Sequence, residues 1–506
     1  MYPHSHPALR PLCLVMIFTP LVLGEREAAE AGSERAATLG RQWDVAVVTG
    51  DKLDAFTGKP IGYGSDGSYQ GELFLYSYRG GQMTQIPFQL DEKTTLGEWV
   101  NRTYPGGTDN VAGLDPNDEL AFLTRDVGDK APAGTYPDEP GTTYSSSIEI
   151  EVADAGDPDQ KGWVYLIRSR NASYTAGDLI THTGPTNFST SAPQVRAAGY
   201  DIGFNAQAQH ADSLYDYLVI KDGAAHSEQL LDKLKVKGEA KVYIGFGWLR
   251  TTFNENLPEI NITLDGVIDG TVRVIETTTR QIRLELLGVE LLNTTVTGTA
   301  YFHPWSVSFP LPIDPAELAN SLPDGFKEIR VAATIDFNEN AIGSVFANEN
   351  ASNVVIDGNP DDVPATMSGW AQVIGTAGRM FIMGNYSVFE GLSWCYRDDS
   401  TGTVAPCIEG VEDTGDGVYI GDTGIHIDVD ALIANPPSTP TSLTMALYFL
   451  PPSASDTGTS LYAKQESGLT ITAAALPGVP VAGVYGALIL MAGFLYPLTR
   501  IRKTKR

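Results

Sequence analysis

The feature that most constrains this chain is a series of short runs in which apolar and polar residues alternate. Ile148, Ile150 and Val152 alternate with two glutamates. Further extended runs occupy residues 71–78, 163–167, 241–248, 281–286, 329–335 and 443–450. A period of two is typical of strands with one buried face and one face in water. Because Gly, Asn, Asp and Pro separate these runs rather than long helical patterns, the sequence predicts a mainly β protein with antiparallel sheets.

The domain division follows from the length and from where the alternation weakens. A chain of 506 residues has room for two or three domains. The least periodic stretch lies at about 205–238, and one short helix is expected there, over residues 226–234. We predict a signal peptide (1–31), a first β-sandwich-like domain (40–235), a second β-sandwich-like domain (236–465), a stalk (466–480), a transmembrane helix (481–498) and a basic cytoplasmic tail (499–506).

The C-terminal prediction depends on an uncharged apolar segment from Val481 to Leu498. A helix of this length reaches roughly 27 Å, close to the thickness of a bilayer core. Five basic residues follow it, namely Arg500, Arg502, Lys503, Lys505 and Arg506. Since basic residues mark the cytoplasmic side of a span, the body of the chain is expected outside the membrane. The alternative is a buried C-terminal core helix with a basic end.

The N-terminus has the pattern of a secretory signal. Arg10 precedes a short apolar region, residues 11–24, and small residues follow it. Cleavage after Gly24 or after Ala31 would fit this pattern. The alternative is an uncleaved N-terminal anchor.

The charge balance limits the kinds of partner. Asp and Glu number 62 against 34 Lys and Arg, which gives a formal net charge of −28. An acidic surface disfavours nucleic acid and anionic membrane surfaces, because phosphate binding requires basic groups. It is compatible with divalent cations.

Two cysteines remain after loss of the signal, Cys395 and Cys407. Outside the cytoplasm such a pair predicts a disulfide. Closing a loop of this size would stabilise the fold by about 3 kcal/mol in the chain-entropy model.

Several loops are rich in Asp and Asn, whose oxygens are the ligands that calcium prefers. The candidate ligands are Asp115, Asn117, Asp118, Glu119, Asp336, Asn338, Asn340, Asp413, Asp416 and Asp422. The alternative is that these residues form the turns between strands. Calcium is the one cofactor that the sequence suggests.

Catalytic motifs are scarce in the sequence. It contains no GxSxG, HExxH or P-loop motif. Adjacent carboxylates, such as Asp91–Glu92 and Asp361–Asp362, are the residue type that glycosidases use. No residue is assigned a catalytic role from the sequence.

Asn-x-Ser/Thr sites permit glycosylation outside the cytoplasm. They lie at Asn101, Asn171, Asn187, Asn261, Asn293, Asn350 and Asn385.

The C-terminal tail resembles the sorting tails of prokaryotic cell-surface proteins. The residues that carry this resemblance are Val479–Pro480, the Gly-containing span from Val481, and Arg500, Arg502 and Lys503. Such tails combine a Pro-containing signature, one membrane helix and a basic cluster, and some are cut and re-anchored by membrane proteases. Segments of the body, such as Ile86–Glu92 and Trp370–Gly375, are similar to parts of uncharacterised secreted β-proteins.

These observations predict a protein of the cell envelope, exported and held by a C-terminal membrane span. A structural, adhesive or ligand-binding role is expected, with calcium as a stabilising ion and a polysaccharide or a protein as partner. One alternative is an extracellular carbohydrate-active enzyme, a glycosidase or lyase, that uses paired carboxylates. Another is a membrane-tethered solute-binding protein.

Overall fold

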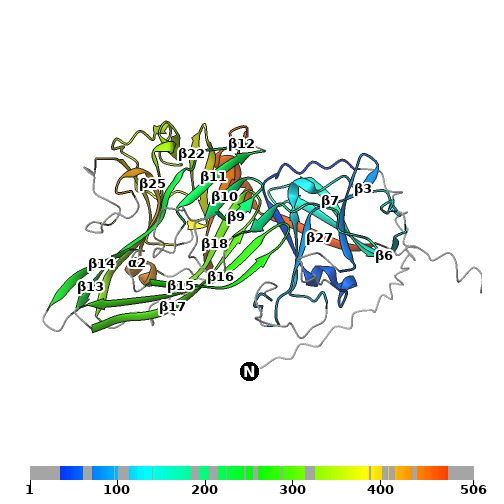
Figure 1. Cartoon of the computed structure of the whole chain (residues 1–506), viewed down its shortest axis with the longest axis horizontal. Coiled ribbons are helices and arrows are strands. Elements are labelled where there is room, and N and C mark those ends of the chain that lie inside the picture. Colours follow the sequence, from blue (N-terminus) through cyan, green and yellow to red (C-terminus); the bar gives the residue numbers. More distant parts are fainter. Residues whose placement is uncertain are drawn as a thin grey trace, which may run out of the picture.

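The computed structural model confirms a mainly β protein in which every strand pairing of the described residues is antiparallel. The structure describes residues 35–60, 71–95, 97–100, 113–139, 141–183, 193–203, 215–223, 225–243, 247–254, 260–286, 289–313, 325–386, 389–401, 408, 416–435 and 441–476. Figure 1 shows two lobes along the long axis of the molecule.

The smaller lobe contains two sheets. One has the strand order β1 (Val45–Thr49), β5 (Glu119–Leu123), β4 (Phe88–Asp91). The other has the order β27 (Leu469–Leu476), β6 (Thr143–Asp154), β7 (Asp157–Arg170), β2 (Leu73–Arg79), β3 (Gln82–Gln85). Apolar side chains from both sheets form one core cluster. This lobe is therefore built as two packed sheets.

The larger lobe contains three sheets. The first has the order β12 (Ala225–His226), β11 (Tyr217–Asp222), β10 (Tyr200–Gly203), β9 (Pro193–Ala197), β8 (Ile180–His182). The second has the order β14 (Trp248–Asn254), β13 (Leu231–Tyr243), β19 (Phe326–Phe337), β25 (Tyr419–Asp428), β24 (Leu392–Asp399). The third has the order β15 (Ile260–Asp269), β16 (Val274–Leu286), β17 (Val289–Phe302), β18 (Ser306–Ile313), β26 (Thr441–Leu450), β23 (Gly378–Gly384), β22 (Trp370–Gly375), β20 (Val345–Asn348), β21 (Val354–Val355).

All three sheets of the larger lobe contribute to one large core. Tyr200 comes from the first sheet, Trp394 from the second and Phe449 from the third, and all three are buried. The rings of Tyr200 and Phe449 lie 4.7 Å apart between centroids. A single core of this extent explains why these sheets form one lobe.

Helical segments are short. They are η1 (Gly50–Phe56), η2 (Thr124–Asp126), η3 (Glu339–Ala341), α2 (Val429–Ala434) and α3 (Gly458–Ser467). The prediction of a helix over 226–234 is wrong, because this stretch joins β12 to the start of β13. Within the described part of the chain, no helix combines the length and apolarity needed to cross a bilayer. The predicted span at 481–498 lies outside that part.

The three-stranded sheet connects the two lobes because both of its faces are buried. Along β5, Leu120 and Phe122 point into the core of the smaller lobe. Ala121 and Leu123 alternate with them and pack in a second cluster with Trp305 and other residues of the larger lobe. Burial on both faces explains the continuous apolar composition of this strand.

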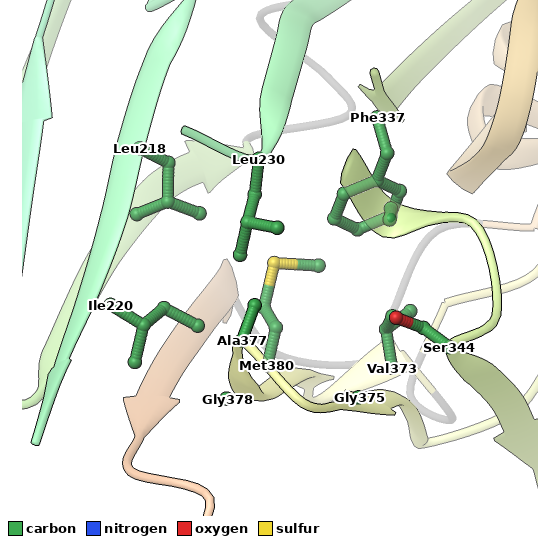
Figure 2. Close-up of a pocket in the computed structure, with 11 residues that line it drawn as sticks. Leu218, Ile220, Leu230, Phe337, Ser344, Val373, Gly375, Ala377, Gly378 and Met380 are labelled. Carbon is green, nitrogen blue, oxygen red and sulfur yellow. The ribbon is translucent and has the colours of Figure 1, made fainter. Parts of the chain in front are cut away.

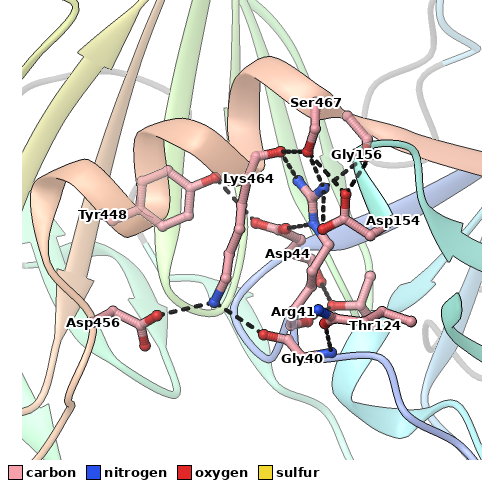
Figure 3. Close-up of polar contacts among 12 residues, drawn as sticks. Gly40, Arg41, Asp44, Thr124, Asp154, Gly156, Tyr448, Asp456, Lys464 and Ser467 are labelled. Carbon is pink, nitrogen blue, oxygen red and sulfur yellow. Dashed lines mark hydrogen bonds and ion pairs between the residues drawn. The ribbon is translucent and has the colours of Figure 1, made fainter. Parts of the chain in front are cut away.

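The chain returns to the smaller lobe at its C-terminal end. Strand β27 pairs with β6 over its whole length, and Figure 1 shows it among the N-terminal strands. Helix α3 precedes it and is held by the buried side chain of Arg41. That guanidinium donates to the carbonyls of Lys464 and Gly468 and pairs with Asp44 at 2.7 Å (Figure 3).

Two boundaries of the predicted division differ from the structure. Residue 236 lies inside β13, so no domain boundary falls there. The expected stalk at 466–480 instead contains the end of α3 and all of β27. Strand β27 belongs to the fold because Ile471 and Ala473 pack against the core of the smaller lobe.

Candidate functional site

The outer end of the β13–β14 hairpin carries an exposed aromatic pair. Tyr243 ends β13 and Trp248 begins β14, and the two residues are opposite each other across the hairpin. Their ring centroids lie 5.5 Å apart at an interplanar angle of 59°. Their exposed fractions are 51% and 47%. Because large aromatic side chains are usually mostly buried, this pair is a candidate contact surface.

Basic side chains lie beside the pair. The Nζ of Lys327 is 3.8 Å from the ring centroid of Trp248, a cation–π contact. Lys241 shares a face of β13 with Tyr243 and pairs with Glu328. The hydrogen bond from Lys241, together with the positive charge of Lys241 and Lys327, lowers the pKa of Glu328. The surface is therefore locally positive in an acidic protein.

Two arginines extend this positive surface along the sheet. The Nη1 of Arg250 lies 2.5 Å from one carboxylate oxygen of Glu239, and the Nη1 of Arg330 lies 3.2 Å from the other. Both arginine side chains remain more than two-fifths exposed (47% and 43%). We call the surface formed by Tyr243, Trp248, Lys241, Lys327, Arg250 and Arg330 the basic aromatic tip.

A small core supports the basic aromatic tip from below. Ala240, Ile329 and Val429 are buried together, so β13, β19 and α2 are packed against one another. Glu328 has a positive φ of 49°, and its N–H donates to the Asp430 carboxylate at 2.5 Å. These contacts fix the backbone that presents Lys327.

The hairpin is located away from the C-terminal strand. Figure 1 shows β13 and β14 at one end of the long axis, and β27, β6 and β3 towards the other. Aromatic side chains can pack on the apolar faces of a ligand's rings, and exposed cations can pair with its carboxylate or sulfate groups. The basic aromatic tip is thus suited to a ligand that combines ring faces with negative charge.

A buried ionic cluster lies on the second sheet nearer the core. Lys233, Lys235 and Lys237 share one face of β13 and are buried. The Nζ of Lys235 contacts the carboxylate of Asp336 on β19, and neither side chain has exposed surface. It also lies 3.6 Å from Asp232.

Burial dominates the ionisation of Asp336. It raises the pKa of this carboxyl well above the usual value, the negative charge of Asp422 raises it further, and Lys235 opposes both. The sequence placed Asp336 and Asp422 in separate loops, and the structure brings them together on the neighbouring strands β19 and β25.

Tyr419 completes this cluster. The centroid of its ring lies 3.5 Å from the guanidinium carbon of Arg397 and 4.6 Å from the Nζ of Lys237. The same ammonium donates to the Tyr419 hydroxyl at 3.0 Å. Arg397 also pairs with Asp399 at 3.4 Å.

The first predicted calcium loop forms turns in the structure. The Asp115 carboxylate accepts the N–H of Asn117 at 3.0 Å. The Asp118 carboxylate accepts the N–H groups of Asp115 at 2.7 Å and Lys93 at 3.0 Å. Glu119 pairs with Lys93 and with Arg273. The hydrogen bonds of Asp115 and Asp118 are those expected if these residues form a turn, which is the alternative that the sequence left open.

The other predicted calcium ligands lie apart from this loop. Asn338 caps η3 by accepting the N–H of Asn340 at 2.9 Å, and both Asn side chains donate to the Gln229 carbonyl. Asp416 accepts the N–H of Val418 at 3.0 Å. Asp413 lies outside the described residues. In the described ranges, no three His, Cys, Asp or Glu side chains are arranged to hold a metal ion.

The disulfide and glycosylation predictions are only partly covered by the described residues. Cys395 is buried in β24, whereas Cys407 lies outside the described residues, so their pairing stays a prediction. Asn101 and Asn187 also lie outside them. Asn261 and Asn293 lie in β15 and β17, Asn171 and Asn350 are exposed, and the half-buried Asn385 accepts the N–H of Thr444.

The paired carboxylates considered for catalysis differ in environment. Asp91 is buried and pairs with Arg273 at 2.9 Å, at the junction of the lobes. Asp361 and Asp362 are exposed. Figure 2 shows a small pocket near β23 that is lined mainly by apolar side chains, including Leu218, Phe337 and Met380.

The basic aromatic tip was missed from the sequence for an identifiable reason. Residues 241–248 were assigned to one strand, because their apolar residues alternate. In the structure β13 ends at Tyr243 and β14 begins at Trp248. The glycines at 245 and 247 were the available signal for a turn.

Comparisons with known proteins leave the family open. No protein-family model matches the chain, and no curated protein sequence matches it. Two solved structures from Enterococcus faecalis resemble it, an alpha-mannosidase and a protein in the glycosyl hydrolase family 38. Both have a TM-score of 0.41 and 10% identity, over 88% of this chain and 46% and 48% of theirs. The chain thus spans about half their length, and the likeness is too weak to support a functional argument.

Proposed function

We propose that this chain is an extracytoplasmic surface protein, anchored by the apolar segment 481–498, that binds an anionic polysaccharide through the basic aromatic tip. The observation that carries the proposal is the half-exposed pair of Tyr243 and Trp248 among four cationic side chains. In a chain with a net charge of −28, such a positive aromatic surface is a local exception.

The chemistry of a polyuronate fits this surface. Each pyranose ring has a C–H face that packs on an aromatic side chain, and each carboxylate pairs with a lysine or arginine. An extended polymer would contact the aromatic pair and the arginines at the same time. Several weak contacts along one polymer act together, so modest single contacts suffice.

The arrangement along the molecule supports presentation of the tip away from a membrane. Strand β27 ends at Leu476, shortly before the apolar segment. The β13–β14 hairpin lies towards the opposite end of the long axis (Figure 1). Anchoring through residues that follow β27 would therefore leave the tip outermost.

Binding to polysaccharides of different charge tests the proposal. The detergent-solubilised full chain is incubated with polygalacturonate and, separately, with an uncharged glucan of similar length, and the bound fraction is measured by co-sedimentation. We expect binding to polygalacturonate that weakens as salt is added, because salt screens the exposed cations.

Variants show whether the tip is responsible. Trp248→Ala is expected to lower the affinity about tenfold or more, which corresponds to about 1.4 kcal/mol. Ile342→Ala is a matched control, because Ile342 is also exposed, at 52%, and lies in the turn after η3, outside the hairpin. Equal affinities of the wild type and Trp248→Ala, or equal binding to both polysaccharides, would contradict the proposal.

A further inference from the structure

We propose that Lys235 and Asp336 become joined by a covalent amide bond that cross-links strands β13 and β19. Asp422, on the adjacent strand β25, would act as the proton-transferring group. The bond would be a self-catalysed modification of this chain, and it is independent of polysaccharide binding.

The three groups come from three adjacent strands of one sheet, in the order β13, β19, β25. Lys235 lies opposite Thr334, and Asp336 is two residues further along β19 on the same face. The pair is thus a diagonal cross-strand neighbour, within reach of a long side chain. The Nζ of Lys235 contacts Oδ2 of Asp336.

The second carboxylate oxygen of Asp336 has a fixed donor. Its Oδ1 accepts the N–H of Ile420 at 3.0 Å. When nitrogen attacks Cγ, negative charge develops on this oxygen, and a backbone N–H already aimed at it stabilises that charge. The geometry therefore holds the nucleophile, the electrophilic carbon and an oxyanion donor together.

Burial favours the neutral forms that react, whereas Asp232, 3.6 Å from Lys235, favours the ammonium. The Lys235 and Asp336 side chains are 0% exposed, and Ile408 packs on Ala332, which shares this face of β19. Burial penalises both charges, and the raised pKa of Asp336 follows from it and from Asp422. Transfer of one proton from the ammonium to the carboxylate gives an amine and a carboxylic acid.

The reaction balances without any further reagent. The neutral Nζ of Lys235 attacks Cγ of protonated Asp336 and forms the C–N bond. Asp422 takes a proton from the nitrogen and delivers it to the departing Oδ2. The C–O bond then breaks, and one water leaves with that oxygen. An ammonium and a carboxylate are thereby converted into one amide and one water.

Peptide mapping of the wild-type protein tests the bond directly. The full chain is denatured, reduced to open any disulfide, digested with trypsin and analysed by mass spectrometry. A cross-link blocks cleavage after Lys235, so we expect residues 234–237 joined to residues 331–379, with the mass of one water lost. Recovery of the peptide 331–379 only in its unlinked form, at full mass, would overturn the proposal.

Variants assign the roles within the cluster. Lys235→Arg is expected to abolish the linked peptide, and Asp422→Asn is expected to lower the linked fraction at least tenfold. Lys233→Arg is the matched control, since Lys233 lies opposite Asp336 in the strand register, and it should retain the link. A link through Lys233, or a full link in Asp422→Asn, would contradict the assignment. If a variant does not fold, the wild-type map still decides.

Discussion

Arg41 is a single buried cation that holds segments from both ends of the chain. Besides its contact with Asp44, its guanidinium lies 3.4 Å from Asp154 at the end of β6. It also donates to the Ser467 hydroxyl at 3.2 Å and to two carbonyls near the end of α3. Tyr448 donates to the other oxygen of Asp44. Such a network is costly to break at one partner, because the remaining charges stay buried.

Replacement of Arg41 by Met should therefore destabilise the protein strongly. We expect a loss of about 3–5 kcal/mol in the free energy of unfolding, the range for removing one partner of a buried ion pair. Urea denaturation followed by tryptophan fluorescence measures it. Arg170→Met is the control, because that side chain is 67% exposed. Equal small losses in both variants would argue against the network.

His303 makes the stability of the folded protein depend on pH. Its burial, and secondly the positive charge of Arg273, lower its pKa from 6.5 to about 3. The unfolded chain takes up this proton near pH 6.5, whereas the folded chain does so only near pH 3. The histidine therefore favours the folded state above pH 6.5, and that contribution is lost as the pH falls towards 3.

The substitution His303→Gln should flatten the acid side of the stability profile. Between pH 6.5 and 4, the free energy of unfolding should fall more steeply in the wild type than in the variant. The difference in slope corresponds to the uptake of at most one proton on unfolding. Chemical denaturation at several pH values gives both slopes. Parallel slopes for the two proteins would contradict the low pKa of His303.

At the scale of elements, β27 is the clearest example of a long-range strand pairing. It pairs with β6, more than 300 residues earlier in the chain, and forms one edge of that sheet. Without β27, the edge of β6 would be open, and Ile148 and Ile150 would lose apolar neighbours.

Truncation separates the roles of β27 and of the residues beyond it. A chain that ends after Leu476 should melt like the full chain, whereas one that ends after Gly468 should melt several degrees lower. Hydrogen exchange of the β6 amides should rise only in the shorter chain. Equal melting temperatures of the two truncated chains would show that β27 contributes no stability.

Calcium can be tested with the same melting experiment. In the described loops, the carboxylates of Asp115, Asp118 and Asp416 accept backbone N–H groups, and Asp336 contacts Lys235. We expect these loops to need no calcium, and millimolar calcium to leave the melting temperature unchanged. A rise of several degrees would instead indicate a bound ion.

The sequence predicted strands well where apolar residues alternate along the chain. Residues 147–152, 329–335 and 443–450 fall within β6, β19 and β26. It misassigned 236 as a boundary, because the stretch at about 205–238 is the least periodic part of the body. In the structure β13 runs through that position and its lysine face is buried. Asp336 on β19 contacts Lys235, and Tyr419 on β25 contacts Lys237. Cross-strand partners of this kind cannot be read from one segment.

The candidate site was harder to predict than the fold. Aromatic exposure depends on where a hairpin turns relative to the rest of the sheet, and no local pattern fixes it. For Tyr243 and Trp248, the period-two pattern was correct on each side of the turn, but the turn itself was missed. The contact between Lys235 and Asp336 joins residues about 100 positions apart, so it depends on strand order.

At the scale of the whole molecule, the two lobes are connected by apolar and ionic contacts together. The ring centroids of Trp43 and Trp305 lie 5.5 Å apart. The guanidinium carbon of Arg125 lies 4.0 Å from the ring centroid of Trp305. Arg273 from the larger lobe pairs with Asp91 and Glu119 of the smaller lobe. A junction of this kind would keep the basic aromatic tip at a fixed distance from β27.

The most direct test is polymer binding by intact cells that express the full chain. Cells are incubated with fluorescent polygalacturonate, and surface fluorescence is compared between the wild type, the double variant Tyr243→Ala/Trp248→Ala and the control Ile342→Ala, at equal surface amounts of protein. The proposal predicts labelling of the wild type and the control, and its loss in the double variant. Equal labelling of all three, or a protein found only in the cytosol, would contradict it.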